Sequence, residues 1–203
     1  MRVLAITGGL GAGKSTAAEL FSAKGAVVLD LDEMAKTLLD EAPPVRERVV
    51  EAFGEAILGP DGRIDRPALA ESAFADAESA WRLDAIVHPA VLAAAGGALD
   101  TLAAQARPPH VVVLVIPLLA EAPAFLELVD AVLVISSEEE SRLERVLVRG
   151  MDERDAERRL ALQVGDAERR LIADYVIEND ADLDAFRRTL ARFWDTEVAA
   201  REA

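Results

Sequence analysis

The sequence predicts an α/β fold in which helices flank a parallel sheet. Short runs of β-branched and apolar residues alternate with segments whose apolar residues recur at helical spacing. The first four elements follow one another as strand, helix, strand and helix, which is the order that a parallel sheet requires. With 203 residues, 52% of them hydrophobic, the chain can bury a core as one domain that carries insertions.

The first strand and the first helix enclose a glycine-rich loop. Residues 3–7 form a short apolar run that opens onto the glycines of residues 8–13, and residues 14–21 have helical apolar spacing. A second strand at residues 26–29 is followed by a helical pattern from Glu33. Right-handed crossovers place both loops at the carboxyl edge of the sheet, where ligands bind in such folds.

The middle of the chain predicts a helical insertion. From about residue 42 to residue 107 there is no strand signal, and the helical stretches are punctuated by Pro43, Pro67 and Pro89. A residue before proline is biased away from the helical conformation, so we expect a helix break at His88.

The sheet resumes after the insertion. Apolar runs predict three more strands, at residues 111–116, 131–135 and 175–177. Ser137 and Glu140 form a capping box that predicts a helix start, and the arginine-studded helical stretch that follows is interrupted near Gly150. A closing helix is predicted over about residues 182–200.

Composition excludes several classes of protein. The 22 Lys and Arg residues against 37 Asp and Glu residues give a net charge of −15, which repels nucleic acid and anionic membranes. The absence of cysteine excludes disulfide scaffolds, thiolate catalysis and cysteine-bound zinc.

The apolar runs are short. Residues 89–99 and 111–120 fall below the roughly 20 residues of a membrane helix and predict buried core, and residues 3–6 are too few for a signal peptide. We therefore expect a cytoplasmic protein with no nucleic-acid, membrane or obligate protein partner.

The strongest motif is a phosphate-binding loop between the first strand and the first helix. Gly8 and Gly13, followed by Lys14 and Ser15, satisfy the P-loop pattern in the required context. In this motif backbone N–H groups hold phosphates, the lysine meets the β and γ phosphates, and the hydroxyl holds Mg²⁺. The alternative is a glycine-rich turn with a solvated lysine, but only three of the 22 basic residues are lysines. The motif predicts ATP or GTP binding.

Missing motifs favour a small kinase among P-loop proteins. A regulatory GTPase needs an Asn-Lys-x-Asp motif, but the three lysines follow Gly13, Ala23 and Ala35. No Asp-x-x-Gly switch motif is present, and the predicted strands at residues 111–116 and 131–135 lack the terminal acidic residue that motor ATPases usually have.

Two carboxylates follow the second predicted strand. Asp30 and Asp32 lie two residues apart, so in extended geometry both side chains point to the same face, toward the phosphate loop. A carboxylate there can accept the proton of an attacking hydroxyl or orient Mg²⁺ through water. Either residue could instead cap the next helix, Asp30 more readily than Asp32. Asp32 is therefore the candidate base.

Arginines gather in the helical stretch after residue 138. Six of them suggest a mobile lid that brings positive charge to the transferring phosphate: Arg142, Arg145, Arg149, Arg154, Arg158 and Arg159. Acids outnumber arginines in this stretch, so surface ion pairs are the alternative for any single arginine.

Histidines and large aromatic residues are few. His88, inside the insertion, is a candidate functional residue, whereas His110 is expected to be structural. Trp81, Phe193 and Trp194 are expected to lie in the core rather than to stack on a nucleotide.

Several further segments accompany the phosphate loop in a fixed order. They are residues 7–16, Asp30 with Asp32, residues 61–66, residues 83–89, residues 117–119 with Glu121, Arg145 with Arg149, Arg159 with Gln163, and residues 173–179. In this order the set resembles the bacterial dephospho-coenzyme A kinase family over nearly the whole chain. Two positions depart from the family pattern: Leu31 stands where Ala is frequent, and Ala120 where Phe is frequent beside the acceptor pocket.

The resemblance implies a P-loop kinase fold, with a parallel five-stranded sheet, an inserted helical substrate domain and a helical lid. The corresponding boundaries are a core of residues 1–40, 108–137 and 171–203, an acceptor-binding insertion of residues 41–107, and a lid of residues 138–170.

The resemblance also implies a reaction and site residues. The reaction is Mg²⁺-dependent transfer of the ATP γ-phosphate to the ribose 3′-hydroxyl of dephospho-coenzyme A, giving coenzyme A and ADP. The implied roles are catalysis by Lys14 and Asp32; ATP binding by Gly11, Ala12, Gly13, Lys14, Ser15, Thr16, Arg145 and Arg149; acceptor binding by Thr7, Asp32, Arg66 and His88; lid contacts by Arg149 and Arg159; and Mg²⁺ binding by Ser15.

The residues by themselves establish only a P-loop kinase with a hydroxyl acceptor. A shikimate-type or nucleoside monophosphate kinase is one alternative. A nucleotide-binding module that signals to a partner is another, although the missing switch motifs argue against it.

Overall fold

The computed structural model describes residues 1–199 and divides into two compact units. One unit, called here the sheet unit, holds Met1–Asp30 and the chain from Leu99 onward; the other, called the helical unit, holds Leu31–Ala98. The insertion boundaries of residues 41–107 stay a prediction.

The sheet unit contains a five-stranded parallel sheet, which confirms the predicted fold class. Its strands are β1 (Arg2–Thr7), β2 (Val27–Asp30), β3 (Val111–Val115), β4 (Ala131–Ser136) and β5 (Tyr175–Glu178). Their order is β2-β3-β1-β4-β5, and every pairing is parallel. The central strand β1 ends at Thr7, so the loop that follows it leaves from the middle of the carboxyl edge.

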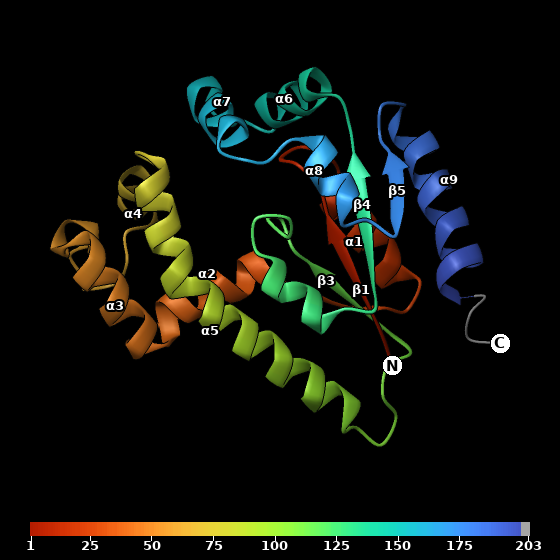
Figure 1. Ribbon diagram of the computed structural model, residues 1–203, viewed down its shortest axis with the longest axis horizontal. Helices are drawn as coiled ribbons and strands as arrows, with labels where there is room; N and C mark the ends of the chain where they lie inside the picture. The colour runs from red at the N-terminus through yellow and green to blue at the C-terminus, as the bar shows by residue number, and fades with distance from the viewer. Residues whose placement is uncertain (200–203) are drawn as a thin grey trace. The chain divides into compact units, whose positions relative to one another are not determined.

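The core lies on both faces of this sheet. Successive side chains of a strand point to opposite faces, and β1 and β4 are almost wholly buried because both faces are covered. On one face, Leu4 and Ile6 pack in a cluster with Phe21 of α1 and with Phe186 and Leu190 of α9. On the other, α8 lies against β4 (Figure 1).

Helices of the sheet unit follow the carboxyl ends of the strands. They are α1 (Lys14–Ala23), α6 (Glu139–Val148), α7 (Glu153–Ala161), α8 (Asp166–Leu171) and α9 (Leu183–Phe193), with the 3-10 helix η2 (Pro123–Leu128) and the π-helix η3 (Trp194–Val198). The predicted interruption near Gly150 separates α6 from α7, and Gly150 has a φ of 90° that favours glycine. As predicted, Phe193 and Trp194 are buried.

The predicted capping box is wrong. Ser137 does not cap α6; its hydroxyl lies 3.0 Å from the Asn179 carbonyl oxygen and 2.8 Å from the Asp180 carboxylate. The same carboxylate accepts from the Glu138 N–H at 2.9 Å. A distant acid thus replaces the local cap, which ties the start of α6 to the end of β5.

The helical unit contains no strand within the described chain. Its elements are α2 (Leu31–Glu41), α3 (Pro43–Phe53), the 3-10 helix η1 (Glu55–Ile57), α4 (Arg66–Ala73) and the greater part of α5 (Ala77–Ala103). Asp65 caps α4, because its carboxylate accepts from the Ala68 N–H at 3.0 Å, and Pro67 occupies the first turn, where a missing N–H costs nothing.

Two expectations fail on α5. The helix continues through Pro89, so there is no break at His88; flanking helix on both sides outweighs the one backbone hydrogen bond that proline cannot make. Trp81 is 71% exposed rather than buried in the core. Helical spacing alone did not reveal which face of α5 is covered.

By length and composition α5 is the one helix in residues 1–199 that could cross a membrane. A core helix of a soluble protein passes the same test, so this is weak evidence. Val87, Val91, Ala95 and Leu99 are buried and recur every four residues, as in a helix with one covered face.

Candidate functional site

The loop between β1 and α1 is shaped by glycines and packed closely by later parts of the chain. Gly11 has a φ of 78°, and a Cβ there would lie 2.4 Å from the backbone oxygen of Arg142 in α6. Gly13 has a φ of 111°, and a Cβ there would lie 2.6 Å from the side-chain nitrogen of Asn179. Only glycine combines these conformations with such close approach.

The loop ends at a helix N-terminus that has no side-chain cap. The N-cap residue is Gly13, which has no side chain that could accept from the first backbone N–H groups of α1. These N–H groups therefore remain available to an anion. Lys14 lies across the loop, where its Nζ donates to the carbonyl oxygens of Gly8 at 2.7 Å and Gly9 at 3.0 Å. This is a phosphate cradle with its cation already in place.

Asn179, just after β5, forms a hydrogen bond to the glycine-rich loop. It is 6% exposed, and its Nδ2 donates to the Ala12 carbonyl oxygen at 2.7 Å. The backbone carbonyl oxygen of Asn179 accepts a hydrogen bond from Arg145 Nη2 at 2.6 Å. The residue just after β5 therefore joins the loop to α6.

We expect Asn179→Ala to lower the free energy of unfolding by about 1–3 kcal/mol, because it leaves the buried Ala12 carbonyl oxygen without its partner. Urea denaturation measures the change. Thr189→Ala is the matched control: its exposed hydroxyl bonds only to Ala185 in its own helix, so a change within about 0.5 kcal/mol is expected. Equal effects of the two substitutions would contradict a stabilising role for the hydrogen bond between Asn179 and Ala12.

Ser15 and Asp30 line one groove of about 570 Å³ beside α1. Asp30 ends β2, and Glu19, one turn after Ser15, also borders the groove. A hydroxyl and carboxylates at the edge of a phosphate loop form the set of oxygen donors that Mg²⁺ prefers.

The expected extended geometry of Asp30 and Asp32 is wrong. The strand ends at Asp30, and α2 begins immediately, at Leu31, so the two carboxylates do not share one strand face. Asp32 lies in the first turn of α2, where an acidic side chain is stabilised by the helix dipole. It belongs to the helical unit, whereas Asp30 belongs to the sheet unit.

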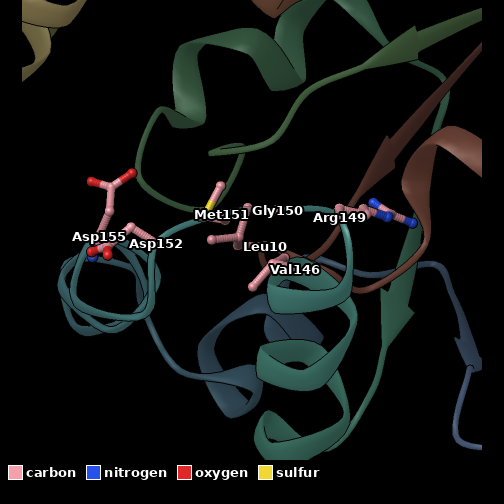
Figure 2. Close-up of a pocket in the computed structure, with 7 residues that line it drawn as sticks. All are labelled: Leu10, Val146, Arg149, Gly150, Met151, Asp152 and Asp155. Carbon is pink, nitrogen blue, oxygen red and sulfur yellow. The ribbon is translucent and has the colours of Figure 1, made fainter.

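The predicted lid arginines lie at three different places. Arg145 of α6 donates to Ser137 Oγ at 2.9 Å and to Gly11 O at 3.5 Å, so it already contacts the loop. Arg149, just after α6, lines a pocket of about 490 Å³ together with Leu10 of the phosphate loop. Figure 2 shows its guanidinium pointing away from the acids that border the pocket. Arg159 lies on α7.

Two of the arginines on α7, Arg158 and Arg159, pair with one acid. Asp155 lies 2.7 Å from Arg158 and 3.0 Å from Arg159. The hydrogen bond from Arg158, aided by the charge of Arg159, lowers the pKa of Asp155 below its ordinary value. The alternative of helix-surface ion pairs thus describes Arg158 and Arg159 in this structure.

Three other predicted site residues are Thr7, Arg66 and His88. Thr7 is 1% exposed at the end of β1, and its hydroxyl donates to the Pro117 carbonyl oxygen at 3.4 Å. Arg66 and His88 belong to the helical unit. Arg66 pairs with Asp40 at 2.6 Å, and His88 Nε2 lies 3.4 Å from Asp84. Their roles toward an acceptor stay predictions.

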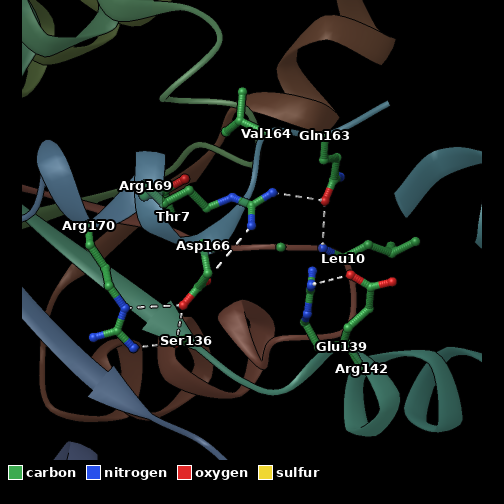
Figure 3. A network of polar contacts seen from close by, with 12 residues as sticks. Thr7, Leu10, Ser136, Glu139, Arg142, Gln163, Val164, Asp166, Arg169 and Arg170 are labelled. Carbon is green, nitrogen blue, oxygen red and sulfur yellow. Dashed lines mark hydrogen bonds and ion pairs between the residues drawn. The ribbon is translucent and has the colours of Figure 1, made fainter. Parts of the chain in front are cut away.

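A polar network beside the loop includes Arg169, which the sequence did not single out (Figure 3). Gln163 Oε1 accepts from the Leu10 N–H at 3.0 Å and from Arg169 Nη2 at 3.4 Å. Burial lowers the pKa of Arg169, the charge of Arg142 acts in the same direction, and that of Glu121 opposes it. No sequence signal distinguishes Arg169 from the neighbouring arginines.

Comparison with known proteins places this arrangement in a family context. Residues 2–185 match the family model described as dephospho-CoA kinase. Curated dephospho-CoA kinases from Streptomyces avermitilis and Corynebacterium diphtheriae are 40% and 37% identical over 195 residues. These alignments cover 96% of this chain in both cases, and 93% and 96% of the respective relatives.

Solved structures show the same fold. A protein from Thermus thermophilus has a TM-score of 0.75 at 33% identity, with 97% of this chain and 98% of that chain covered. A dephospho-CoA kinase from Campylobacter jejuni has a TM-score of 0.71 at 25% identity, with 99% and 100% covered. A shikimate kinase from Acinetobacter baumannii, with a TM-score of 0.56 at 17% identity and 98% and 96% covered, shares the fold alone.

Proposed function

The chain belongs to the dephospho-CoA kinase family, and on that premise we propose that it phosphorylates the ribose 3′-hydroxyl of dephospho-coenzyme A with ATP. The observation that carries the proposal is the phosphate cradle with Lys14 laid across it, in a chain matched to this family over residues 2–185. In the reaction the bond between the acceptor oxygen and the γ-phosphorus forms as the bond to the ADP oxygen breaks, and the hydroxyl proton is released.

On the donor side, the amides of residues 11–16 would bind the phosphates of ATP. The Gly8 and Gly9 carbonyl oxygens hold the Lys14 ammonium at the loop, so little reorganisation is needed when charge develops on the transferred group. Arg145 and Arg149, from α6 and its C-terminal end, would add positive charge to the nucleotide, and Arg159 would approach with the lid.

Mg²⁺ fits the donor set of the groove beside α1. Ser15 and Asp30 would hold the ion there, as a hydroxyl and a carboxylate that share one groove. In residues 1–199 no group of three or more His, Asp and Glu side chains could enclose a metal, which suits an ion that takes its other ligands from phosphates and water. When bound, Mg²⁺ neutralises charge that develops on the phosphoryl oxygens.

On the acceptor side, Asp32 would accept the proton of the 3′-hydroxyl. Asp32 follows Asp30 by two residues along the chain, so the Cα atoms of the two residues lie about 7 Å apart at most. Thr7, Arg66 and His88 would contact the acceptor. Arg66 suits an anionic acceptor, because a planar guanidinium can donate two hydrogen bonds to one phosphate. The ion pair between Arg66 and Asp40 would have to open first. The cytoplasm, which supplies both substrates, is the proposed location.

A coupled assay of ADP release with different acceptors tests the proposal. We expect dephospho-coenzyme A to drive ADP release with Mg²⁺ present, and mass spectrometry to show coenzyme A as the product. Omission of Mg²⁺ should abolish the signal. Shikimate or a nucleoside monophosphate should give none. Release driven by either of these acceptors, or partner-stimulated hydrolysis without a phosphorylated product, would overturn the proposal.

A further inference from the structure

Two arginines beside the phosphate loop carry buried charge without a full set of partners. Arg142 is 7% exposed and Arg169 is 1% exposed. Within the described chain, Nε of Arg142 and both Nε and Nη1 of Arg169 make no hydrogen bond. A buried guanidinium with unmade hydrogen bonds costs free energy, so each needs a reason to be there.

The contacts that the two guanidiniums do make are long. Arg142 lies 3.7 Å from Glu139, and Arg169 lies 3.8 Å from Asp166. Arg169 also donates to Gln163 at 3.4 Å, near the outer limit of a hydrogen bond. Figure 3 shows these contacts around the Leu10 amide. Such contacts neutralise the charges only weakly.

Glu121, the acid that attracts Arg169 most strongly, already accepts a hydrogen bond from another residue. Glu121 Oε1 accepts from the Val164 N–H at 3.0 Å. Its Oε2 makes no hydrogen bond to any described residue, so it does not supply the donors of Arg169 with an acceptor.

Arg170, the next residue along α8, shows how a structural arginine is satisfied in this fold. It donates to Asp166 at 3.2 Å, to Ser136 at 2.9 Å and to Glu178. These partners raise its pKa, with the bond to Glu178 as the largest cause. Arg170 thus has the full set of partners that its neighbour Arg169, and Arg142 on α6, lack.

Both unsatisfied guanidiniums converge on Gly9 of the phosphate loop. A Cβ at Gly9 would lie 2.0 Å from Arg142 Nη1 and 3.3 Å from Arg169 Nη1. Lys14 also donates to the Gly9 carbonyl oxygen. Gly9 is an unspecified position of the P-loop pattern and has no positive φ, so neither the motif nor the backbone requires glycine there. A side chain at position 9 would displace the Arg142 guanidinium from this place and crowd that of Arg169.

We propose that Arg142 and Arg169 form a second cationic wall of the phosphate site, which binds the terminal phosphoryl group of a nucleoside triphosphate. The inference deepens the proposed function and rests on it for the identity of the donor. Planar guanidinium forks match phosphoryl oxygens, and in phosphoryl transfer charge is spread over three such oxygens. A nucleoside diphosphate lacks that group and leaves the two arginines without their anion.

Calorimetric binding of ADP and of its imido-triphosphate analogue AMP-PNP to Arg169→Met tests this. We expect the affinity for AMP-PNP to fall by about 10-fold or more, as a lost charged hydrogen bond does, and the affinity for ADP to change by less than about 2-fold. The turnover number should fall by about 10- to 100-fold. If both nucleotides bind as to the parent protein, or weaken equally, the proposal is wrong.

Thermal unfolding without nucleotide separates binding from a structural role. Arg169→Met should leave Tm unchanged or raise it, because an apolar side chain replaces an underpartnered buried charge. Arg170→Met, the matched control, should lower Tm and keep the AMP-PNP to ADP preference of the parent. A fall in Tm for Arg169→Met with that preference kept would overturn the proposal.

A second variant covers the case in which Arg169→Met does not fold. Arg169→Lys keeps the charge but loses the fork, so we expect a folded protein with a reduced AMP-PNP to ADP preference; an unchanged preference would contradict the proposal. These binding measurements need no acceptor. If the nucleotide preference is unchanged while coenzyme A is still formed, only the role of the two arginines is wrong. If the preference changes but another acceptor is phosphorylated, only the proposed acceptor is wrong.

Discussion

We expect Lys14→Ala to lower the turnover number of phosphoryl transfer by about 10²- to 10³-fold, the scale for removal of one preorganised cation from the transferring group. The ammonium group is held by two loop carbonyl oxygens, at 2.7 and 3.0 Å, so it is in place before the nucleotide arrives. No second lysine can replace it, since the others are at positions 24 and 36. Single-turnover ADP formation at saturating ATP measures the loss.

Lys24→Ala is the matched control for Lys14→Ala. Lys24 follows the same helix, but its Nζ pairs with Asp195 at 2.7 Å on an exposed surface, where such pairs contribute about 1 kcal/mol or less to stability. We expect transfer at the parent rate. Parent-like transfer by Lys14→Ala, or an equal loss in both variants, would show that the loop is not the donor site.

Asp32→Asn is expected to lower the turnover number by about 10²- to 10⁴-fold, because an amide cannot accept the proton of the acceptor hydroxyl. The KM for ATP should stay close to that of the parent, since the proposed base does not contact the donor. Initial rates over a matrix of both substrates, together with calorimetric ATP binding, separate the two parameters.

Glu33→Gln is the control for the base. Glu33 is the next residue in the same first turn of α2, and its pair with Lys36 at 2.5 Å lowers its pKa, so it carries a comparable charge. It should retain turnover within a few-fold of the parent. Parent-like turnover in Asp32→Asn would remove Asp32 from the role of base and leave the donor site unaffected.

Much of the fold was predictable because its elements correspond to patterns of residues that are contiguous in the sequence. The five strands are short β-branched runs, and the phosphate loop is a contiguous motif whose glycines, lysine and serine follow one another in sequence. Predictions from local sequence were wrong at two helices, α6 and α5. Asp180, not Ser137 in a capping box, accepts from the start of α6, and α5 continues through Pro89.

The site was less predictable than the fold because burial separates its arginines. Arg169 and Arg170 are adjacent and chemically identical, yet one is buried with unmade hydrogen bonds and the other has three partners. That difference depends on which face of α8 packs against β4, and a six-residue helix carries too little periodicity to reveal it. Asn179 is a similar case, since its bond to Ala12 joins residues 167 positions apart.

The central place of β1 has a consequence for biogenesis. Arg2 is paired with Val111 and Leu4 with Ala131, so β1 gains a neighbouring strand only after the whole segment between β1 and β3 has been translated. Closing such long loops is slow and costs entropy. Until Asn179 has been translated, the glycine loop lacks the hydrogen bond to Ala12, and we expect the nascent protein to acquire affinity for nucleotides only after residue 179 has left the ribosome.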